Sequence, residues 1–303
     1  MCLVKGGISY LFIMTTIEEG AILICSAIQN ALQTNSGLLI GRLGTVEYEC
    51  VASPTASAPW SVLERNAGVF PTPASTWCKA YKEALQKADC LATGWYAPMA
   101  SGEQHLLRSL GWSGHQVKLR SLEAYYVEAS DRWTKLLEDQ DVCVVSSFAE
   151  TMAKQVKKGN HIWGSLQTAS LLPSSTRWSF VRTGYAPSLA QGRATWLEAT
   201  GEEINSWEEA VEATVKQILA TKARIILIGC GGLGMILASR LKQEGRICIM
   251  MGGAIQVLFG VKGMRWRHHE VISKFWNSEW VWPSVEETPA GSETVEGSCY
   301  WLR

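Results

Sequence analysis

Short runs of continuously apolar residues alternate along the chain with segments in which apolar residues recur every three or four positions. Continuous apolar runs are typical of strands buried on both faces of a sheet, and the second pattern is typical of helices with one apolar side. The predicted strands are Leu38–Ile40, Val142–Val145, Ile225–Ile228 and Ile247–Met251, with weaker candidates at Cys90–Thr93 and Trp178–Arg182. This alternation predicts an α/β fold with a mostly parallel sheet covered by helices.

Capping residues mark the starts of several predicted helices. A Ser or Thr followed three residues later by Glu satisfies backbone groups at a helix N-terminus. The pairs are Thr16 with Glu19, Ser147 with Glu150 and Ser206 with Glu209. Pro73, followed by Trp77, Tyr81 and Leu85 at a spacing of four, indicates a further helix. Segments 94–104 and 163–176 are rich in Gly, Ser, Thr and Pro, and we expect loops there.

The composition is that of a chain with a substantial core. Of the 303 residues, 47% are hydrophobic and 18% are charged, which gives no sign of disorder. We expect residues 1–14 to be a loose N-terminal extension and residues 15–303 to form a single α/β domain, because no long linker divides them. No run approaches the roughly 20 apolar residues of a membrane-spanning helix, so we expect no transmembrane segment.

The balance of charge argues against one class of partner. The chain has 28 Lys and Arg against 28 Asp and Glu, whereas nucleic-acid binders carry a basic excess that neutralises phosphates. We therefore expect no nucleic-acid partner. The nine cysteines form no Cys-x-x-Cys pair, and Cys143 and Cys248 lie within apolar runs. Such cysteines are typical of a reduced compartment, so we expect a cytoplasmic protein.

A glycine motif follows the predicted strand Ile225–Ile228. It reads Gly229-Cys230-Gly231-Gly232-Leu233-Gly234 and leads into a predicted helix. In this position glycines let the backbone approach a phosphate, although a tight strand–helix turn needs small residues as well. No acidic residue about 20 positions further on is placed to hold a ribose hydroxyl, which disfavours a nicotinamide cofactor.

Cations and hydroxyls near other predicted strand ends add to a candidate anion site. Lys262 and Arg265 stand beside glycines and are candidates to clamp a pyrophosphate, the alternative being a solvated basic loop. Ser146 and Ser147 end the strand Val142–Val145, where hydroxyls and amides meet an anion or simply cap a helix.

The turn after the first predicted strand carries a third candidate, Arg42 and Glu47. Ligands of open α/β sheets bind beyond the carboxyl ends of strands, where both residues project. Glu47 is the candidate metal ligand or catalytic acid or base, and Glu296 is a distant second. The alternative is an Arg42–Glu47 ion pair that fixes the turn.

Taken in order, these motifs resemble the GT-D-fold glycosyltransferase-like proteins found in bacterial polysaccharide loci and some viruses. The motifs are Gly41–Glu47, Asn66–Pro71, Ser146–Ala149, Ile228–Gly234, Gly252–Trp266 and Val295–Trp301. The resemblance covers roughly residues 37–301 and implies a Rossmann-like fold of GT-D type. It also implies sugar transfer from a nucleotide-sugar donor, to a glycan or other hydroxyl acceptor, with a divalent metal, Mn²⁺ or Mg²⁺.

One position departs from the family motif Arg-x-Gly-Asp-x-Glu. Arg42, Gly44 and Glu47 match it, whereas Thr45 stands where the family has aspartate. The resemblance implies that Glu47 binds the metal, with Mg²⁺ able to use few protein ligands beside donor phosphates. Thr45 also leaves open metal-independent chemistry or a protein that only binds.

We therefore interpret the chain as a glycosyltransferase with a diphosphate site at one edge of its sheet. The expected donor-binding residues are Arg42, Gly44, Thr45, Asn66, Ser146, Ser147, Gly229, Gly231, Gly232, Lys262 and Arg265. A nucleotide-binding protein without catalysis is the alternative, and a Rossmann-type oxidoreductase is a weaker one. Trp280, Trp282, Tyr300 and Trp301 are candidates for an acceptor-sugar platform or for packing of the C-terminal segment.

Overall fold

The computed structural model describes residues 16–164, 170–198 and 200–302. Within these residues seven strands form one sheet in the order β3-β2-β1-β7-β6-β4-β5, and neighbouring strands all pair in parallel. The strands are β1 (Leu38–Arg42), β2 (Cys90–Ala92), β3 (His115–Val117), β4 (Asp141–Ser146), β5 (Arg177–Arg182), β6 (Ile225–Gly229) and β7 (Ile247–Met250). The predicted α/β class with a parallel sheet is confirmed. The predicted extension 1–14, and residues 165–169 of one predicted loop, lie outside the described residues.

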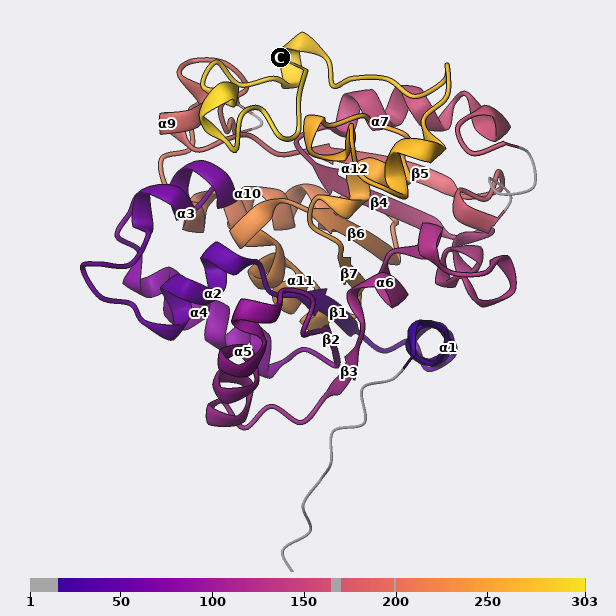
Figure 1. The fold of residues 1–303 in the computed structure, drawn as a ribbon, viewed down its shortest axis with the longest axis horizontal. Coiled ribbons are helices and arrows are strands. Elements are labelled where there is room, and N and C mark those ends of the chain that lie inside the picture. The colour runs from indigo at the N-terminus through magenta and orange to yellow at the C-terminus, as the bar shows by residue number, and fades with distance from the viewer. Residues whose placement is uncertain (1–15, 165–169, 199, 303) are drawn as a thin grey trace, which may run out of the picture.

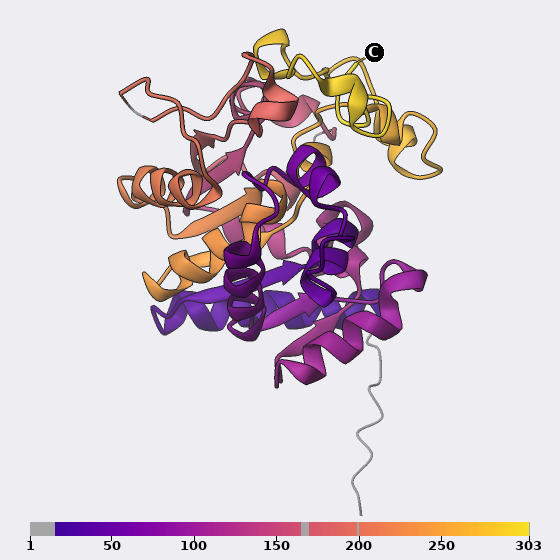
Figure 2. The same ribbon diagram turned by 90° about the vertical axis from the view of Figure 1, so that its left-hand side faces the viewer.

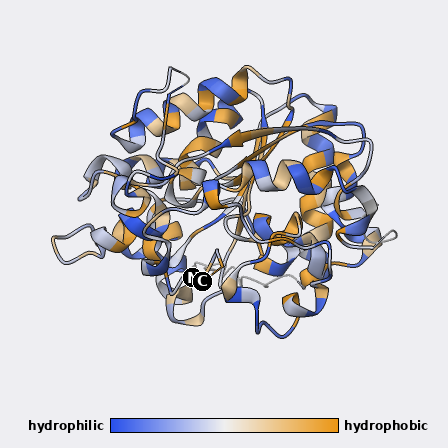
Figure 3. Cartoon of the chain, turned by 90° about the horizontal axis from the view of Figure 1, so that it is seen from above, coloured by the Kyte–Doolittle hydropathy of each residue, from blue (hydrophilic) through white to orange (hydrophobic). Residues whose placement is uncertain are grey.

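Both faces of the sheet are covered by helices, which is why its strands are apolar throughout. In β1, Leu39 joins the core on one face, whereas Leu38 and Ile40 join the core on the other, as the period-two geometry of a strand requires. One layer contains α2 (Thr45–Ala52), α3 (Trp60–Ala67), α4 (Ser75–Gln86), α5 (Ala97–Ser109), α10 (Trp207–Leu219) and α11 (Gly234–Gln243). The other contains α1 (Ile17–Gln33), α6 (Leu119–Leu122), α7 (Ala149–Val156) and α12 (Ala254–Leu258). Figure 1 shows the sheet between these layers, and in Figure 3 hydrophobic colour follows the strands.

Shorter elements complete the chain. They are α9 (Pro187–Ala190) and the 3₁₀ helices η1 (Ala124–Tyr126), η2 (Ala129–Asp131), η3 (Trp133–Leu137), η4 (Gly159–His161), η5 (Gly231–Leu233), η6 (Met264–Trp266), η7 (Ile272–Phe275), η8 (Val285–Glu287) and η9 (Ser292–Thr294). The segment that follows α12, yellow in Figures 1 and 2, lies at the end of the molecule opposite β3 and α5. Among the helices of the described residues, none is long and apolar enough to cross a membrane.

Two of the predicted helix starts are confirmed by their hydrogen bonds. Thr16 and Glu19 form the complete capping box of α1, and Ser206 accepts a hydrogen bond from the backbone N–H of Glu209 at the start of α10. Helix α4 is also confirmed, with the predicted apolar positions Trp77, Tyr81 and Leu85 fully buried.

The predicted capping box of Ser147 with Glu150 is wrong. Helix α7 begins after Phe148, and no side chain of its own N-terminal turn caps it. The buried carboxylate of Glu287 takes this place instead, because it accepts hydrogen bonds from the backbone N–H groups of Glu150 (2.8 Å) and Thr151 (3.1 Å). A residue 136 positions away in sequence thus caps the helix.

One further expectation is corrected, and one strand was missed. The predicted loop 94–104 contains the first half of α5, because Pro98 stands in the first turn, where a proline is tolerated. Gly102 in this helix lies against the hydroxyl of Tyr48, where a Cβ would come within 1.8 Å. Strand β3 was not predicted, because its sequence His115-Gln116-Val117 is short and mostly polar, as an edge strand paired only with β2 allows.

Candidate functional site

A cleft of about 610 Å³ lies at the carboxyl edge of the sheet. It is lined by the turns that follow β1, β2, β4, β5, β6 and β7, together with the end of α3, Arg265 and four residues near the C-terminus, Val295, Glu296, Tyr300 and Trp301. This is where ligands of open α/β sheets bind, and the volume lies in the range of small-molecule sites. The turns on which the sequence analysis depended therefore meet in one place.

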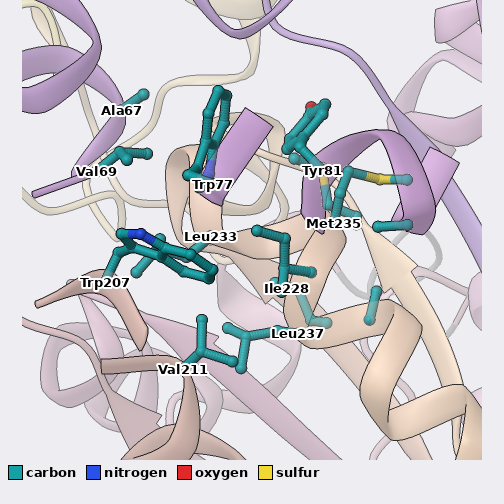
Figure 4. Packing of buried hydrophobic residues seen from close by; sticks show 14 of the residues in the cluster. Ala67, Val69, Trp77, Tyr81, Trp207, Val211, Ile228, Leu233, Met235 and Leu237 are labelled. Atoms are coloured by element: carbon teal, nitrogen blue, oxygen red, sulfur yellow. The ribbon is translucent and has the colours of Figure 1, made fainter. Parts of the chain in front are cut away.

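Most of the predicted donor-binding residues line this cleft. They are Arg42, Gly44, Thr45, Glu47, Asn66, Ser146, Ser147, Gly229, Gly231 and Arg265. Gly232 and Lys262 do not line it. The carbonyl of Gly232 accepts a hydrogen bond from Trp77 Nε1 (2.9 Å) in the core, and Figure 4 shows Trp77 beside the neighbouring Leu233. The ammonium of Lys262 lies 5.6 Å from the ring centre of Trp276.

The carboxylate of Glu47 is held over Gly44. Glu47 stands in the first turn of α2, whose N-cap is Gly44, and only 8% of Glu47 is exposed. A Cβ on Gly44 would lie 1.9 Å from Oε2 of Glu47, so this position of the carboxylate requires glycine. The glycine of the motif therefore makes room for the Glu47 carboxylate.

Burial changes the acid strength of Glu47. Removal from water raises the pKa of this carboxyl above its ordinary value, while its own backbone N–H and the Arg42 charge oppose the rise. A carboxyl with a raised pKa is suited to exchange protons nearer neutral pH than a surface glutamate. The position and the pKa direction make Glu47 a candidate functional residue.

The residues around Glu47 do not form a metal site on their own. Throughout the described part of the chain, no three His, Cys, Asp or Glu side chains come together as a ligand group. Thr45, which lines the cleft where the family motif has aspartate, supplies no second carboxylate. The divalent metal therefore stays a prediction that depends on phosphate oxygens as further ligands, and no step proposed below uses one.

Arg42 makes no direct ion pair within the described residues, which excludes the alternative of an Arg42–Glu47 ion pair. In residues 16–164, 170–198 and 200–302 no carboxylate lies within ion-pair distance of its guanidinium. Its Nε is buried and donates a hydrogen bond to no atom of these residues. Its Cζ lies 4.5 Å from the ring centre of Trp95. A guanidinium without a direct ion pair, whose charge opposes the rise in pKa that burial causes at the Glu47, Glu103 and Glu123 carboxyls, thus lines the cleft at the end of β1.

The expected Lys262–Arg265 clamp is not formed. Lys262 lies outside the cleft lining, and Arg265 donates to the Glu296 carboxylate (2.7 Å) and to the Tyr300 hydroxyl (3.0 Å). A second arginine, Arg65 at the end of α3, lines the cleft instead. Within the described residues it pairs with no carboxylate, and its Nε donates to Asn66 (3.3 Å). Sequence reasoning noted Asn66 but missed the arginine beside it.

The glycines of the turn after β6 are explained by close packing of neighbouring turns. Gly231 has a φ of +54°, and a Cβ there would lie 2.5 Å from the carbonyl oxygen of Ala67 in α3. A Cβ on Gly229 would lie 2.5 Å from Ile255 Cγ2 in α12. The glycines thus fit a tight strand–helix turn, and because this turn also lines the cleft, the interpretation as a phosphate-binding turn stays compatible with them.

Aromatic residues form another part of the cleft wall. Tyr300 and Trp301 line it, but Trp280 is buried in the core and Trp282 packs on Trp276, so the four predicted rings do not form one platform. Tyr185 and Trp196 from the segment after β5 were missed and line the cleft as well.

The chain was compared with known proteins. Its sequence matches no family model, and no curated protein matches it. It is similar to solved structures of the domain of unknown function DUF1792. A selenomethionine-substituted structure of that domain has 13% identity and a TM-score of 0.42, over 78% of this chain and 81% of the other. A second, described as having a distinct glycosyltransferase fold, has 16% identity and a TM-score of 0.40, over 78% and 80%.

A third structure is described as a new glycosyltransferase (DUF1792) from Streptococcus sanguinis. It has 13% identity and a TM-score of 0.42, over 76% of this chain and 80% of the other.

Proposed function

We propose that this chain is a glycosyltransferase that moves a sugar from a nucleotide-sugar donor to a glycan or another hydroxyl acceptor. The observation that carries the proposal is the cleft itself, which is lined by Arg42, Arg65 and the buried Glu47. Neither arginine makes a direct ion pair with a carboxylate of the described residues. Guanidinium groups that make no direct ion pair are suited to bind an anionic ligand. The sequence motif around Arg42 and Glu47 adds a resemblance to sugar transferases.

Arg42 and Arg65 would neutralise the diphosphate of the donor. Negative charge grows on the nucleoside diphosphate as its bond to the sugar breaks, so fixed cations stabilise the transition state more than the ground state. The hydroxyls of Ser146 and Ser147 and the turn at Gly229–Gly231 line the same cleft and supply further polar groups. This assignment replaces the clamp expected from Lys262 and Arg265.

Glu47 is the proposed catalytic carboxylate. It would accept the proton of the acceptor hydroxyl while that oxygen forms a bond to the anomeric carbon and the diphosphate leaves with the electrons of the broken bond. Its raised pKa favours this role, because a proton acceptor works best when its pKa lies near the working pH. Tyr185 and Tyr300, both half-buried in the cleft wall, offer ring surface for an acceptor sugar.

The test is turnover of a panel of nucleotide sugars, with and without Mn²⁺ or Mg²⁺, by the wild type and by Glu47→Gln. Loss of one catalytic proton acceptor typically lowers the rate by about 10²–10⁴-fold. Glu83→Gln, which removes an exposed carboxylate on α4, is the matched control and keeps wild-type turnover.

Two results would contradict the proposal. Full activity of Glu47→Gln would remove Glu47 from the chemistry. Binding of nucleoside diphosphates without turnover of any donor would support the alternative of a binding protein instead. Thermal shift with UDP and GDP detects the binding in the second case, because a ligand that binds only the folded state raises the melting temperature.

A further inference from the structure

The loop that follows β2 lies against Arg42. The ring centre of Trp95 is 4.5 Å from Cζ of Arg42, and Trp95 Nε1 donates a hydrogen bond to the carbonyl of Leu43 (3.1 Å). Both contacts join this loop to the turn that carries the functional residues of β1. Trp95 is half-buried and lines the cleft.

A buried carboxylate also forms a hydrogen bond with the backbone of this loop. Glu103 in α5 is fully buried, and its Oε2 accepts a hydrogen bond from the backbone N–H of Gly94 (2.8 Å). Its other oxygen, Oε1, has no hydrogen-bond partner among the described residues. Burial raises the pKa of this carboxyl, which reflects the cost of keeping it out of water, while the hydrogen bond from Gly94 and the nearby Arg42 charge oppose the rise. An apolar residue at this position would fit the core at lower cost, so the contact with Gly94 requires an explanation.

The stacked pair has a consequence for ligand binding. A guanidinium that lies on an aromatic ring loses much of its freedom, and its edge N–H groups stay available for a phosphate. Less conformational entropy is then lost when the phosphate binds. The position of the Arg42 charge therefore depends on Trp95, and the position of Trp95 depends on the loop that Glu103 holds.

We propose that Trp95 and Glu103 are positioning residues that fix the Arg42 guanidinium in the cleft for the diphosphate of the donor. Trp95 acts by stacking on Arg42, and Glu103 acts by tying down the Gly94–Trp95 backbone. This inference rests on the proposed function, since it names the residues that prepare the same site for its ligand.

The test is a double-mutant cycle with inorganic pyrophosphate as the probe, measured by calorimetry on the full chain. Trp95→Leu is expected to weaken binding by about 5- to 20-fold, within the range of a lost cation–π contact. In the Arg42→Ala background the same change is expected to weaken binding by less than about 2-fold, because its effect acts through the arginine. Arg42→Gln, closer in size, provides a second background, and circular dichroism checks that each variant is folded.

The outcomes separate the inference from the proposed function. If Trp95→Leu weakens binding equally with and without Arg42, Trp95 does not act through Arg42 and the inference is wrong. If the wild type binds pyrophosphate and the cycle is coupled but no donor is turned over, the proposed function fails while the positioning role stands. If the wild type does not bind pyrophosphate, the inference is wrong, whereas donor turnover still decides the proposed function.

Glu103 is tested by a conservative pair of variants. Glu103→Gln keeps an oxygen that accepts from Gly94 and should retain pyrophosphate affinity within about 2-fold, whereas Glu103→Ala should weaken it about as much as Trp95→Leu does. The loss should again disappear in the Arg42→Gln background, which a general effect on folding would not reproduce. Equal affinity of Glu103→Ala and the wild type would overturn the role of Glu103.

Discussion

At the scale of single residues, the position of the Glu47 carboxylate depends on the absence of a Cβ at Gly44. Gly44 has a φ of −84° and a ψ of 159°, a conformation that any residue adopts, so its backbone does not require glycine. The requirement comes from the Glu47 carboxylate, which occupies the space of a Cβ. Sequence reasoning identified the glycine but assigned it to the approach of a ligand.

Gly44→Ala should therefore separate activity from stability. The new methyl group displaces the Glu47 carboxylate, a flexible end that moves more easily than backbone, so we expect turnover to fall by at least about 10-fold. Stability should change by no more than about 1 kcal/mol, because the backbone tolerates alanine. Donor turnover and urea unfolding measure the two effects. Wild-type turnover would show that the carboxylate position is not needed.

Glu47 also predicts a pH dependence of stability. Its pKa is higher in the folded chain than the ordinary 4.5, so folding favours the protonated form. The stability that this proton contributes is present below pH 4.5 and is lost as the pH rises through the folded pKa. Glu47→Gln has no proton to lose. Its free energy of unfolding should therefore rise relative to the wild type as the pH increases above 4.5.

This comparison is made by urea unfolding at a series of pH values. Glu83→Gln serves as the control, because Glu83 is exposed on α4. The difference between its free energy of unfolding and that of the wild type should stay nearly constant over the pH series. If the free energy of unfolding of Glu47→Gln also differs from the wild type by a constant amount at every pH, burial does not shift the pKa of the Glu47 carboxyl.

At the scale of elements, α7 depends on a carboxylate from the far end of the chain. Glu287 accepts from the N–H groups of Glu150 and Thr151, and the Thr151 hydroxyl also donates to it. Helix N-termini otherwise leave such groups unsatisfied. Ser147, the cap expected from sequence, stands too early, because α7 starts at Ala149.

Glu287→Ala should destabilise the fold by about 2–4 kcal/mol, since it leaves buried N–H groups without partners at a helix start. Glu286→Ala, at the exposed neighbouring position, should change stability by no more than about 0.5 kcal/mol. Urea unfolding of both variants measures the difference. Equal stability of the two would mean that α7 does not need this cap.

The segment beside Arg265 contains three consecutive residues with left-handed backbone. The φ angles of Glu296, Gly297 and Ser298 are +46°, +64° and +65°, a conformation that costs stability at the two non-glycine positions. The ion pair of Glu296 with Arg265 stabilises this turn. The same pair occupies a guanidinium that lines the cleft.

Glu296→Gln should therefore bind inorganic pyrophosphate more tightly, by about 3- to 10-fold, because a phosphate no longer competes with a carboxylate for Arg265. Glu293→Gln, an exposed change of the same charge on the same segment, should leave affinity unchanged. Weaker binding by Glu296→Gln would show that the ion pair serves only to hold the turn. Calorimetry measures the pyrophosphate affinity of both variants and of the wild type.

At the scale of the whole molecule, local pattern predicted the core of the sheet and failed where distant segments meet. The runs at β1, β4, β6 and β7 are apolar because helices cover both faces, so their sequences alone indicate buried strands. Strand β3 carries no such signal. The cleft was predicted at the correct edge, but only packing shows that Arg65 joins it and that Lys262 does not.

The topology also predicts where the backbone is best protected. Strand β7 pairs with β1 on one side and β6 on the other, whereas β3 pairs with β2 alone. Hydrogen exchange followed by mass spectrometry should therefore find the slowest amides in Ile247–Met250 and much faster ones in His115–Val117. Similar rates in both strands would contradict a fold that opens from its edge.

The central place of β7 has a consequence for biosynthesis. Strands β1 and β6 precede residues 247–250 along the chain, so each exposes an unpaired apolar edge from the time it leaves the ribosome until the strand between them follows. Such edges pair readily with other chains. The interval between the emergence of β6 and that of β7 from the ribosome is thus when we expect these two edges to be most open to pairing with other chains.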